Sequence, residues 1–213
     1  MERTELKFML SATQAAVLEA RLKALMKPDT HASEDGSYCV RSLYFDTLSM
    51  DFYNDNLAGA GIRKKYRLRL YDGKTDLIKS EIKSREYIKI NKTGKDITES
   101  DAREMMLGRK SVAAIPGLFP VCICEYTRRA YYYAPGNVRI TFDSNLSASA
   151  ECGLFLDGGF HKLPVMAPGT VLMEVKFDSF LPAHIKDALN IGSLRRTSFS
   201  KYCSCIEACR PYR

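Results

Sequence analysis

The chain has 213 residues, which is enough for one sizeable domain with a hydrophobic core. Hydrophobic residues make up 46% of the chain and charged residues 27%, a balance that argues against wholesale disorder and a coiled coil. The formal net charge of +7 suits solubility or a polyanionic partner, and it carries no information about the fold.

No apolar run approaches the length of about 20 residues that a membrane-spanning helix needs, and the chain begins with charged residues rather than a signal peptide. We therefore expect a cytoplasmic protein. The seven cysteines include no CxxC pair and no matching histidine spacing, which argues against a disulfide framework and a zinc site. We expect reduced, mostly buried thiols and assign no role to the three histidines.

Hydrophobic periodicity and turn signals predict a chain of strands with few helices. Ser11 is a good N-cap for the first helical pattern, which Pro28 closes. The turns "DGKTD" and "APGN" each predict a hairpin. In chain order, the predicted elements are a strand at 3–10, a helix at 12–26, strands at 37–47, 62–72 and 77–92, a helix at 98–106, strands at 121–133, 138–149 and 169–178, a short helix from Pro182 to Leu189, and a terminal helix at 198–210.

The hairpin signals favour a mainly β fold of the α+β kind. We expect an antiparallel barrel or tunnel of about eight strands with peripheral helices. No linker divides the chain, so a single domain over residues 1–213 is predicted.

Basic side chains recur at alternate positions of several predicted strands. Lys65, Arg67 and Arg69 share one face because residues two apart in a strand point the same way. The same alternation groups Glu5 with Lys7; Lys79 with Glu81 and Lys83; Tyr126 with Arg128; Arg139 with Thr141 and Asp143; and Glu174 with Lys176.

For any single strand, the simplest interpretation of such a row is the solvated face of a sheet. Across five or six strands, however, solvated faces mix both charge signs with neutral polar residues, whereas these rows are mainly cationic. Like charges on neighbouring strands repel, so an anion is needed to offset them. A phosphate chain inside a tunnel fits better than nucleic acid, since the chain has no tryptophan to serve as a stacking platform.

Eight motifs occur in order across nearly the whole chain: "ELKF", "VRSLYFDT", "KYRLRLY", "SEIKSR", "EYTRRAY", "VRITFD", "LMEVKF" and "SFSKYC". Together they resemble the VTC domain, the catalytic domain of the vacuolar transporter chaperone polyphosphate polymerases and their bacterial relatives, within the triphosphate tunnel metalloenzyme superfamily. The resemblance implies an antiparallel β-tunnel. It also implies transfer of the γ-phosphoryl group of ATP to inorganic polyphosphate, assisted by Mn²⁺ or Mg²⁺.

The resemblance also implies roles for individual residues. Glu174 matches the metal-binding glutamate of the family. The expected catalytic phosphate ligands are Lys7, Arg67, Arg69, Lys83, Arg128, Arg139 and Lys201. Further substrate-binding residues are expected at Lys92, Lys176, Ser200, Tyr126, Glu5 and Glu81. ATP and polyphosphate are the expected partners, a membrane-protein partner is left open, and the oligomeric state is not fixed.

One position departs from the wider superfamily. Its CYTH members begin with a glutamate-rich ExExK strand, and the matching stretch here, "RTELK", has Arg3 in place of the first glutamate. This change weakens the case for a site with several carboxylates and favours the VTC branch over triphosphatases and cyclases.

The identity of the nucleophile distinguishes a polymerase from a hydrolase. A phosphate oxygen is already anionic near neutral pH, so polymerisation needs no general base, whereas hydrolysis must activate water. Glu81 could serve as such a base, so some hydrolysis is expected. The alternatives to a polymerase are an inorganic or nucleoside triphosphatase, a non-catalytic polyphosphate-binding module, and a basic barrel without phosphate function.

Overall fold

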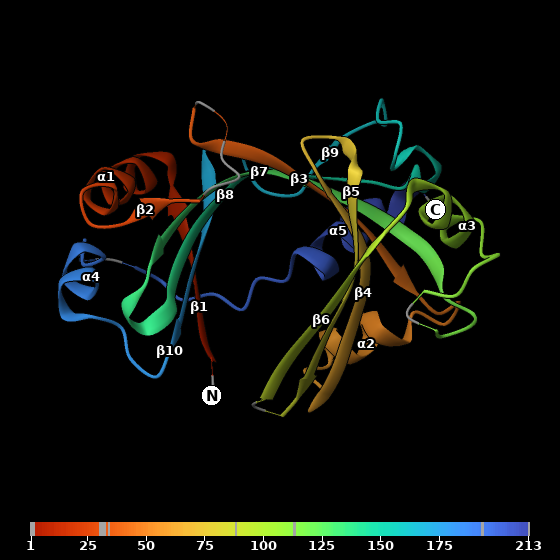
Figure 1. Cartoon of the computed structure of the whole chain (residues 1–213), viewed down its shortest axis with the longest axis horizontal. Coiled ribbons are helices and arrows are strands. Elements are labelled where there is room, and N and C mark those ends of the chain that lie inside the picture. Colours follow the sequence, from red (N-terminus) through yellow and green to blue (C-terminus); the bar gives the residue numbers. More distant parts are fainter. Residues whose placement is uncertain are drawn as a thin grey trace. The chain divides into compact units, whose positions relative to one another are not determined.

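A computed structural model describes residues 3–29, 33, 35–87, 89–112, 114–192 and 194–212 (Figure 1). His31 lies outside the described residues. The chain clusters into two compact units. Unit 1 comprises Met1–Tyr38, Tyr126–Leu146 and Met166–Phe199, and unit 2 comprises Cys39–Glu125, Ser147–Val165 and Ser200–Arg213. The single domain expected from the sequence stays a prediction.

The described residues form strands, α-helices and short 3₁₀ helices. In chain order these are β1 (Arg3–Ser11), α1 (Ala12–Lys23), β2 (Lys27–Pro28), β3 (Ser37–Asp46), α2 (Asp51–Leu57), β4 (Ile62–Tyr71), β5 (Lys74–Glu86), β6 (Lys89–Ile97), α3 (Glu99–Met106), β7 (Phe119–Tyr133), η1 (Pro135–Asn137), β8 (Val138–Ser149), η2 (Cys152–Leu154), β9 (Leu163–Pro164), β10 (Thr170–Asp178), α4 (Ala183–Ala188), α5 (Lys201–Cys209) and η3 (Arg210–Tyr212).

The sheet is antiparallel in every pairing that the structure registers, so the predicted fold class is confirmed. In unit 1 the strand order is β1-β10-β8-β7, and in unit 2 it is β7-β3-β4-β5-β6. Strand β7 belongs to unit 2 up to Glu125 and to unit 1 from Tyr126.

Two predicted segments differ from the structure. The segment 77–92 was expected to be one strand, but the chain turns at Tyr87 and forms both β5 and β6. Tyr87 has a φ of 54°, which a tyrosine rarely adopts, and no glycine, proline or asparagine marks this turn in the sequence. The expected connector before β4 contains helix α2, in which the backbone amides of Phe52 and Tyr53 donate hydrogen bonds to buried Asp46.

The predicted start signals and turn chemistry are confirmed. Ser11 caps α1 in a capping box with Gln14, and Thr98 caps α3 by accepting a hydrogen bond from Asp101. Asp72 and Gly73 join β4 to β5, and both have the positive φ, 52° and 69°, that a type I′ hairpin turn requires. The starts of α1 and α3 and the turn between β4 and β5 are therefore determined by local sequence.

Each unit has its own hydrophobic core on one side of its strands. In unit 1, α1 and α4 pack on the apolar face of β8 and β10, around Leu18, Ile140 and Val175 (Figure 1). In unit 2, α3 and the segment around Phe155 pack on the apolar face of β3, β4 and β5, around Leu68. The opposite sheet face of each unit carries the polar rows predicted from the sequence.

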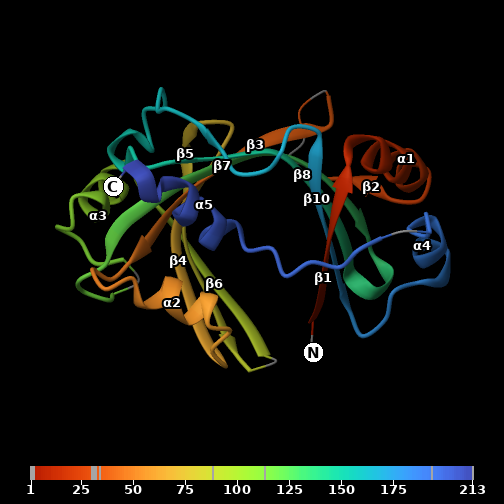
Figure 2. The same cartoon turned by 180° about the vertical axis from the view of Figure 1, so that it is seen from behind.

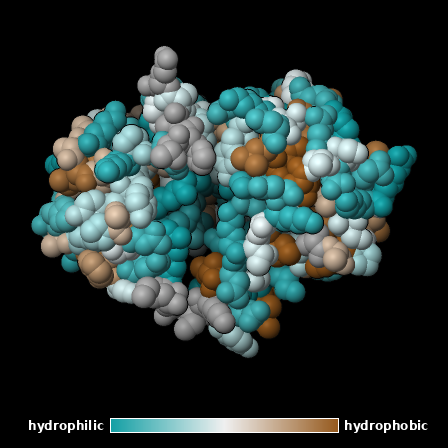
Figure 3. Space-filling view, in the orientation of Figure 1, coloured by the Kyte–Doolittle hydropathy of each residue, from teal (hydrophilic) through white to brown (hydrophobic). Residues whose placement is uncertain are grey.

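Hydrophilic residues cover most of the face shown in Figure 3, and apolar residues gather in a few patches on it. Among the helices that the described residues form, none combines the length and apolar character needed to cross a lipid bilayer. All seven cysteines are free thiols, and five of them are buried.

Candidate functional site

The polar face of unit 2 is the sheet surface that carries Lys65, Arg67, Arg69, Glu81, Lys83 and Lys92. Adjacent strands β4 and β5 place Arg67 directly opposite Glu81. Arg67 donates from Nε and Nη2 to Glu81 Oε2, at 2.7 Å each. Arg69 Nη1 lies 3.6 Å from the same oxygen, and Lys92 Nζ lies 2.5 Å from Oε1. One buried carboxylate thus holds three cations that the sequence predicted as phosphate ligands.

The electrostatics of Glu81 follow from this arrangement. Burial by itself would raise the pKa of the carboxyl group, but the positive charges of Arg67, Arg69 and Lys92 outweigh it and lower the pKa to about 2. Glu81 is therefore ionised at neutral pH. A group that is ionised and engaged by three cations is poorly suited to act as a general base.

Three lysines face one another across neighbouring strands of the same face. Lys65 is opposite Lys83, and Lys83 is opposite Lys92. Lys65 Nζ also donates a hydrogen bond to Ser200 Oγ at 2.9 Å. Like charges directly opposite each other repel across a sheet.

Helix α5 lies on the polar face of unit 2 (Figure 2). Its N-cap, Ser200, accepts a hydrogen bond from Cys203 N, and Tyr202 donates a 2.5 Å hydrogen bond to Asp46 of β3. The helix starts at Lys201 and therefore brings this predicted ligand to the face.

The buried thiol of Cys124 on β7 reports the charge at this position. A hydrogen bond with Cys205 of α5 is the main cause that lowers the pKa of Cys124, and the charges of Lys201, Arg69 and Arg67 lower it further. The structure brings together the predicted residues Arg67, Arg69, Glu81, Lys83, Lys92, Ser200 and Lys201 in unit 2.

The polar face of unit 1 is the sheet surface that carries Glu5, Lys7, Arg128, Arg139, Thr141, Asp143, Glu174 and Lys176. Three strands align two polar rows on it: Lys7, Glu174 and Thr141 in one, and Glu5, Lys176 and Arg139 in the next. Lys176 Nζ lies 2.6 Å from Glu174 Oε2. Lys7 Nζ lies 3.6 Å from Glu5 and donates to the backbone oxygen of Phe199 at 2.8 Å.

Arg128 is held by Asp143, which is not among the predicted site residues. Its Nε and Nη2 donate to the two oxygens of Asp143 at 2.6 and 2.7 Å. Burial would lower the pKa of Arg128, but Asp143 raises it well above the usual value. The guanidinium carbon also lies 5.2 Å from the ring centroid of Tyr126. Asp143 is fully buried, so this fork is fixed in orientation.

Arg139 has two partners that sequence reasoning also missed. Its Nη2 donates to Asp29 at 2.6 Å and to the Tyr38 hydroxyl at 3.3 Å. Both partners are distant from Arg139 in sequence, and neither belongs to the motifs that pointed to the site. In unit 1 the structure places the predicted residues Glu5, Lys7, Tyr126, Arg128, Arg139, Glu174 and Lys176.

Arg41, which lies within the motif "VRSLYFDT", points away from the polar face of unit 2. It is opposite Leu70, on the core side of the sheet. Its Nε donates to Glu125 at 2.6 Å, its Nη1 donates to Phe155 O at 2.9 Å, and Lys162 contacts the same glutamate. Arg41 is therefore part of a structural ion cluster in unit 2.

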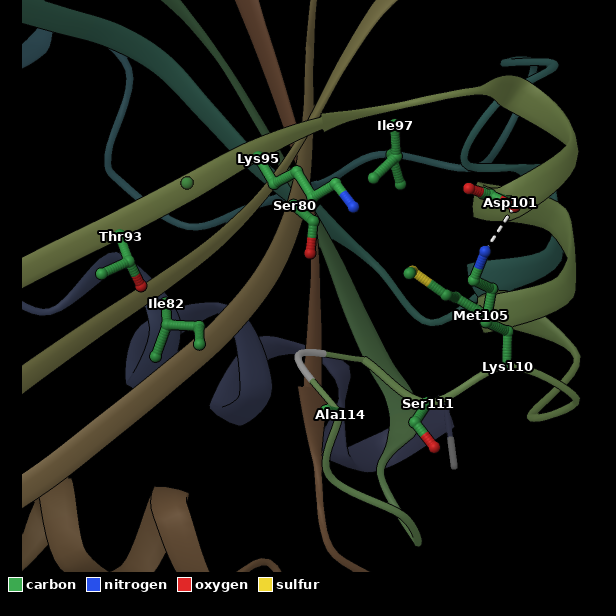
Figure 4. Close-up of a pocket in the computed structure, with 11 residues that line it drawn as sticks. Ser80, Ile82, Thr93, Lys95, Ile97, Asp101, Met105, Lys110, Ser111 and Ala114 are labelled. Carbon is green, nitrogen blue, oxygen red and sulfur yellow. Dashed lines mark hydrogen bonds and ion pairs between the residues drawn. The ribbon is translucent and has the colours of Figure 1, made fainter.

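A separate pocket of about 670 Å³ lies between β5, β6 and α3 (Figure 4). Ser80 and Ile82, which line it, flank Glu81 in sequence and so point to the other side of the sheet. None of the predicted site residues lines this pocket, which the close-up shows with Lys95 and Met105 at its walls. The predicted site and this pocket are distinct.

Within the described ranges, no three histidine, cysteine, aspartate or glutamate side chains form a group suited to hold a metal ion.

The comparisons agree with the motif series. The VTC domain family model matches residues 2–210. A solved structure from Hippeastrum, a candidate adenylyl cyclase described with a dominant triphosphatase activity, has a TM-score of 0.56 at 15% identity, covering 97% of this chain and 96% of that chain. A candidate adenylate cyclase of Bacillus halodurans has a TM-score of 0.49 at 14% identity, covering 88% and 87%.

No curated protein matches the chain. At 15% identity, the likeness to the Hippeastrum protein shows a shared fold. The family match, which spans almost the entire sequence, and this fold support an enzyme of the triphosphate tunnel type. The chain belongs to the VTC domain family.

Proposed function

We propose that the protein is a polyphosphate polymerase that transfers the γ-phosphoryl group of ATP to a growing polyphosphate chain. The observation that carries this proposal is the clustering of Arg67, Arg69 and Lys92 around one buried carboxylate. Because these cations are held together before any ligand binds, a chain of phosphates meets a preorganised array. Two arginine forks on one strand suit successive phosphoryl groups.

In the proposed reaction, the protein positions the reacting phosphates and neutralises their negative charge. On the polar face of unit 1, Arg128 presents a guanidinium that Asp143 orients, and Lys7 lies beside Glu174 in the row of three strands. These cations would neutralise the charge on the transferring group and hold the acceptor phosphate in line. Cytoplasmic ATP is the proposed donor, and the seven free thiols fit a reducing compartment.

Glu174 is the proposed protein ligand for Mn²⁺ or Mg²⁺. Its carboxylate is the type of hard oxygen donor that both ions prefer, and it is almost fully buried within a row that includes a threonine hydroxyl. The residues therefore fit such an ion. When bound, the ion would polarise phosphate oxygens and stabilise the leaving group.

Within the described residues, the glutamates on the two polar faces are engaged by cations, and this favours transfer of the phosphoryl group to phosphate over transfer to water. Neither described histidine, His161 or His184, lies on a polar face; the ring of His184 packs against Tyr133 at 5.2 Å. Glu81 and Glu174 are both engaged by cations. The second candidate is a triphosphatase, which is favoured by the activity described for the Hippeastrum protein of similar fold.

The test is incubation of the purified protein with ATP and Mn²⁺, followed by separation of the products on a polyacrylamide gel. The proposal expects ADP and a ladder of long phosphate chains, whereas orthophosphate without chains would establish the triphosphatase instead. The Arg67→Ala variant should lose polyphosphate binding. Arg109→Ala is the matched control, because the Arg109 side chain is 68% exposed on another part of unit 2.

A further inference from the structure

Thr141 carries an unusual buried hydroxyl group. The residue is 1% exposed, and its Oγ1 is the one buried side-chain nitrogen or oxygen in the described part of the chain that has no hydrogen-bond partner. Buried polar groups are nearly always paired, because leaving them unpaired costs stability. An unpaired hydroxyl inside a polar face indicates a group that finds its partner when a ligand binds.

The strand register places this hydroxyl beside the proposed metal ligand. Thr141 on β8 is directly opposite Glu174 on β10, and Lys7 on β1 is opposite Glu174 from the other side. Directly opposite residues of antiparallel strands share a face and have neighbouring Cβ atoms. Thr141 also lies between Arg139 and Asp143 in the alternation of β8, so it belongs to the polar face of unit 1.

Phosphate and a divalent cation, the two ligands proposed for this face, are bound by different types of side chain. Phosphate oxygens need cations and donors, and the face already supplies Lys7, Arg128, Arg139 and Lys176. A divalent cation needs oxygen donors, and these are scarce, since no group of three metal-binding side chains occurs within the described ranges. Threonine and serine hydroxyls bind Mg²⁺ beside substrate phosphates in other phosphoryl-transfer sites.

We propose that Thr141 Oγ1 is a second protein oxygen ligand, beside Glu174, for the divalent cation of this site. The proposal rests on the metal position given under the proposed function. Lys176 Nζ lies 2.6 Å from Glu174 Oε2, so Glu174 would exchange this contact for the cation, and the Thr141 hydroxyl would gain the partner that it lacks.

The test compares Mn²⁺ binding by Thr141→Val, Thr141→Ser and the unmodified protein. Free Mn²⁺ is counted by its electron paramagnetic resonance signal during titration of protein that holds a fixed, saturating amount of tripolyphosphate, and a titration of the same tripolyphosphate without protein corrects for Mn²⁺ bound in solution. Thr141→Val keeps the shape of the side chain and removes the hydroxyl, so we expect its dissociation constant for Mn²⁺ to rise about tenfold or more. Thr141→Ser should bind like the unmodified protein, and so should Thr93→Val, a control on an exposed strand of unit 2.

A second readout separates a metal ligand from a packing residue. Removing an unpaired buried hydroxyl should leave the melting temperature of the metal-free protein unchanged or raise it, while the rise in melting temperature caused by Mn²⁺ should shrink. Mn²⁺ binding by Thr141→Val equal to that of the unmodified protein would overturn the proposal.

Glu174→Gln distinguishes this proposal from the one on which it rests. If Glu174→Gln weakens Mn²⁺ binding and Thr141→Val does not, the role of Thr141 is wrong and the metal position stands. If neither variant changes Mn²⁺ binding, both are wrong. If both variants weaken binding but ATP yields only orthophosphate, the polymerase activity is wrong and the Thr141 ligand is supported.

Discussion

Glu81→Gln tests whether one buried carboxylate holds together the cations on the polar face of unit 2. The pKa of Glu81 lies at about 2, against an ordinary value of 4.5. A difference of about 2.5 pH units, at about 1.4 kcal/mol per unit, corresponds to roughly 3.5 kcal/mol of unfolding free energy. The Glu81 side chain is 3% exposed, so solvent screening reduces this magnitude little. We expect Glu81→Gln to lower the unfolding free energy by about this amount at pH 7.

The lowered pKa of Glu81 determines how its contribution to stability changes with pH. Because the pKa in the folded state lies below that in the unfolded state, the ionised carboxylate stabilises the protein fully above about pH 4.5, and this contribution is lost as the pH falls towards about 2. The unmodified protein and Glu81→Gln should therefore differ at pH 7 and converge below pH 4.5.

Urea unfolding followed by circular dichroism at several pH values between 7 and 3 measures this difference. Glu104→Gln is the control, since the Glu104 side chain is 43% exposed on α3. Equal unfolding free energies of Glu81→Gln and the unmodified protein at pH 7, or a difference that does not narrow below pH 4.5, would refute the reasoning.

Three further substitutions test contacts that the structure shows. Asp143→Asn leaves the partly buried Arg128 without its anionic partner and should cost about 3 kcal/mol in urea unfolding; a change below about 1 kcal/mol would contradict the importance of this fork on fully buried Asp143. Ser11→Ala removes the capping box of α1 and should lower the unfolding free energy by about 1 kcal/mol, with Ser11→Thr as the conservative control. Tyr202→Phe removes the hydrogen bond to buried Asp46 and should lower the unfolding free energy by about 1 to 3 kcal/mol. An unchanged unfolding free energy would show that this hydrogen bond does not stabilise α5.

The sequence alone predicted the features that depend on local chemistry. Alternation with a period of two placed Lys65, Arg67 and Arg69 on one face, and the strand β4 has this arrangement. Ser11 predicted the start of α1, and the Asp-Gly pair predicted the turn after β4. These features could be predicted because the residues that decide them lie within a few positions of one another.

In strand β3, the orientation of the side chains could not be predicted from alternation. It is buried on both faces, so its hydrophobic run hides the alternation that identified the other rows. The motif "VRSLYFDT" therefore did not reveal that Arg41 faces Glu125 in the core of unit 2. The turn at Tyr87 was likewise hidden, because no residue in "SREYIK" favours a positive φ.

The partners of the basic residues were decided by the tertiary structure alone. Glu81 holds Lys92, and Asp143 holds Arg128, because the pairing of strands brings side chains from different segments to one place. The same pairing sets Thr141 opposite Glu174 and leaves its hydroxyl without a partner. Local sequence patterns determine which face a side chain occupies, whereas the register between strands determines what it meets there.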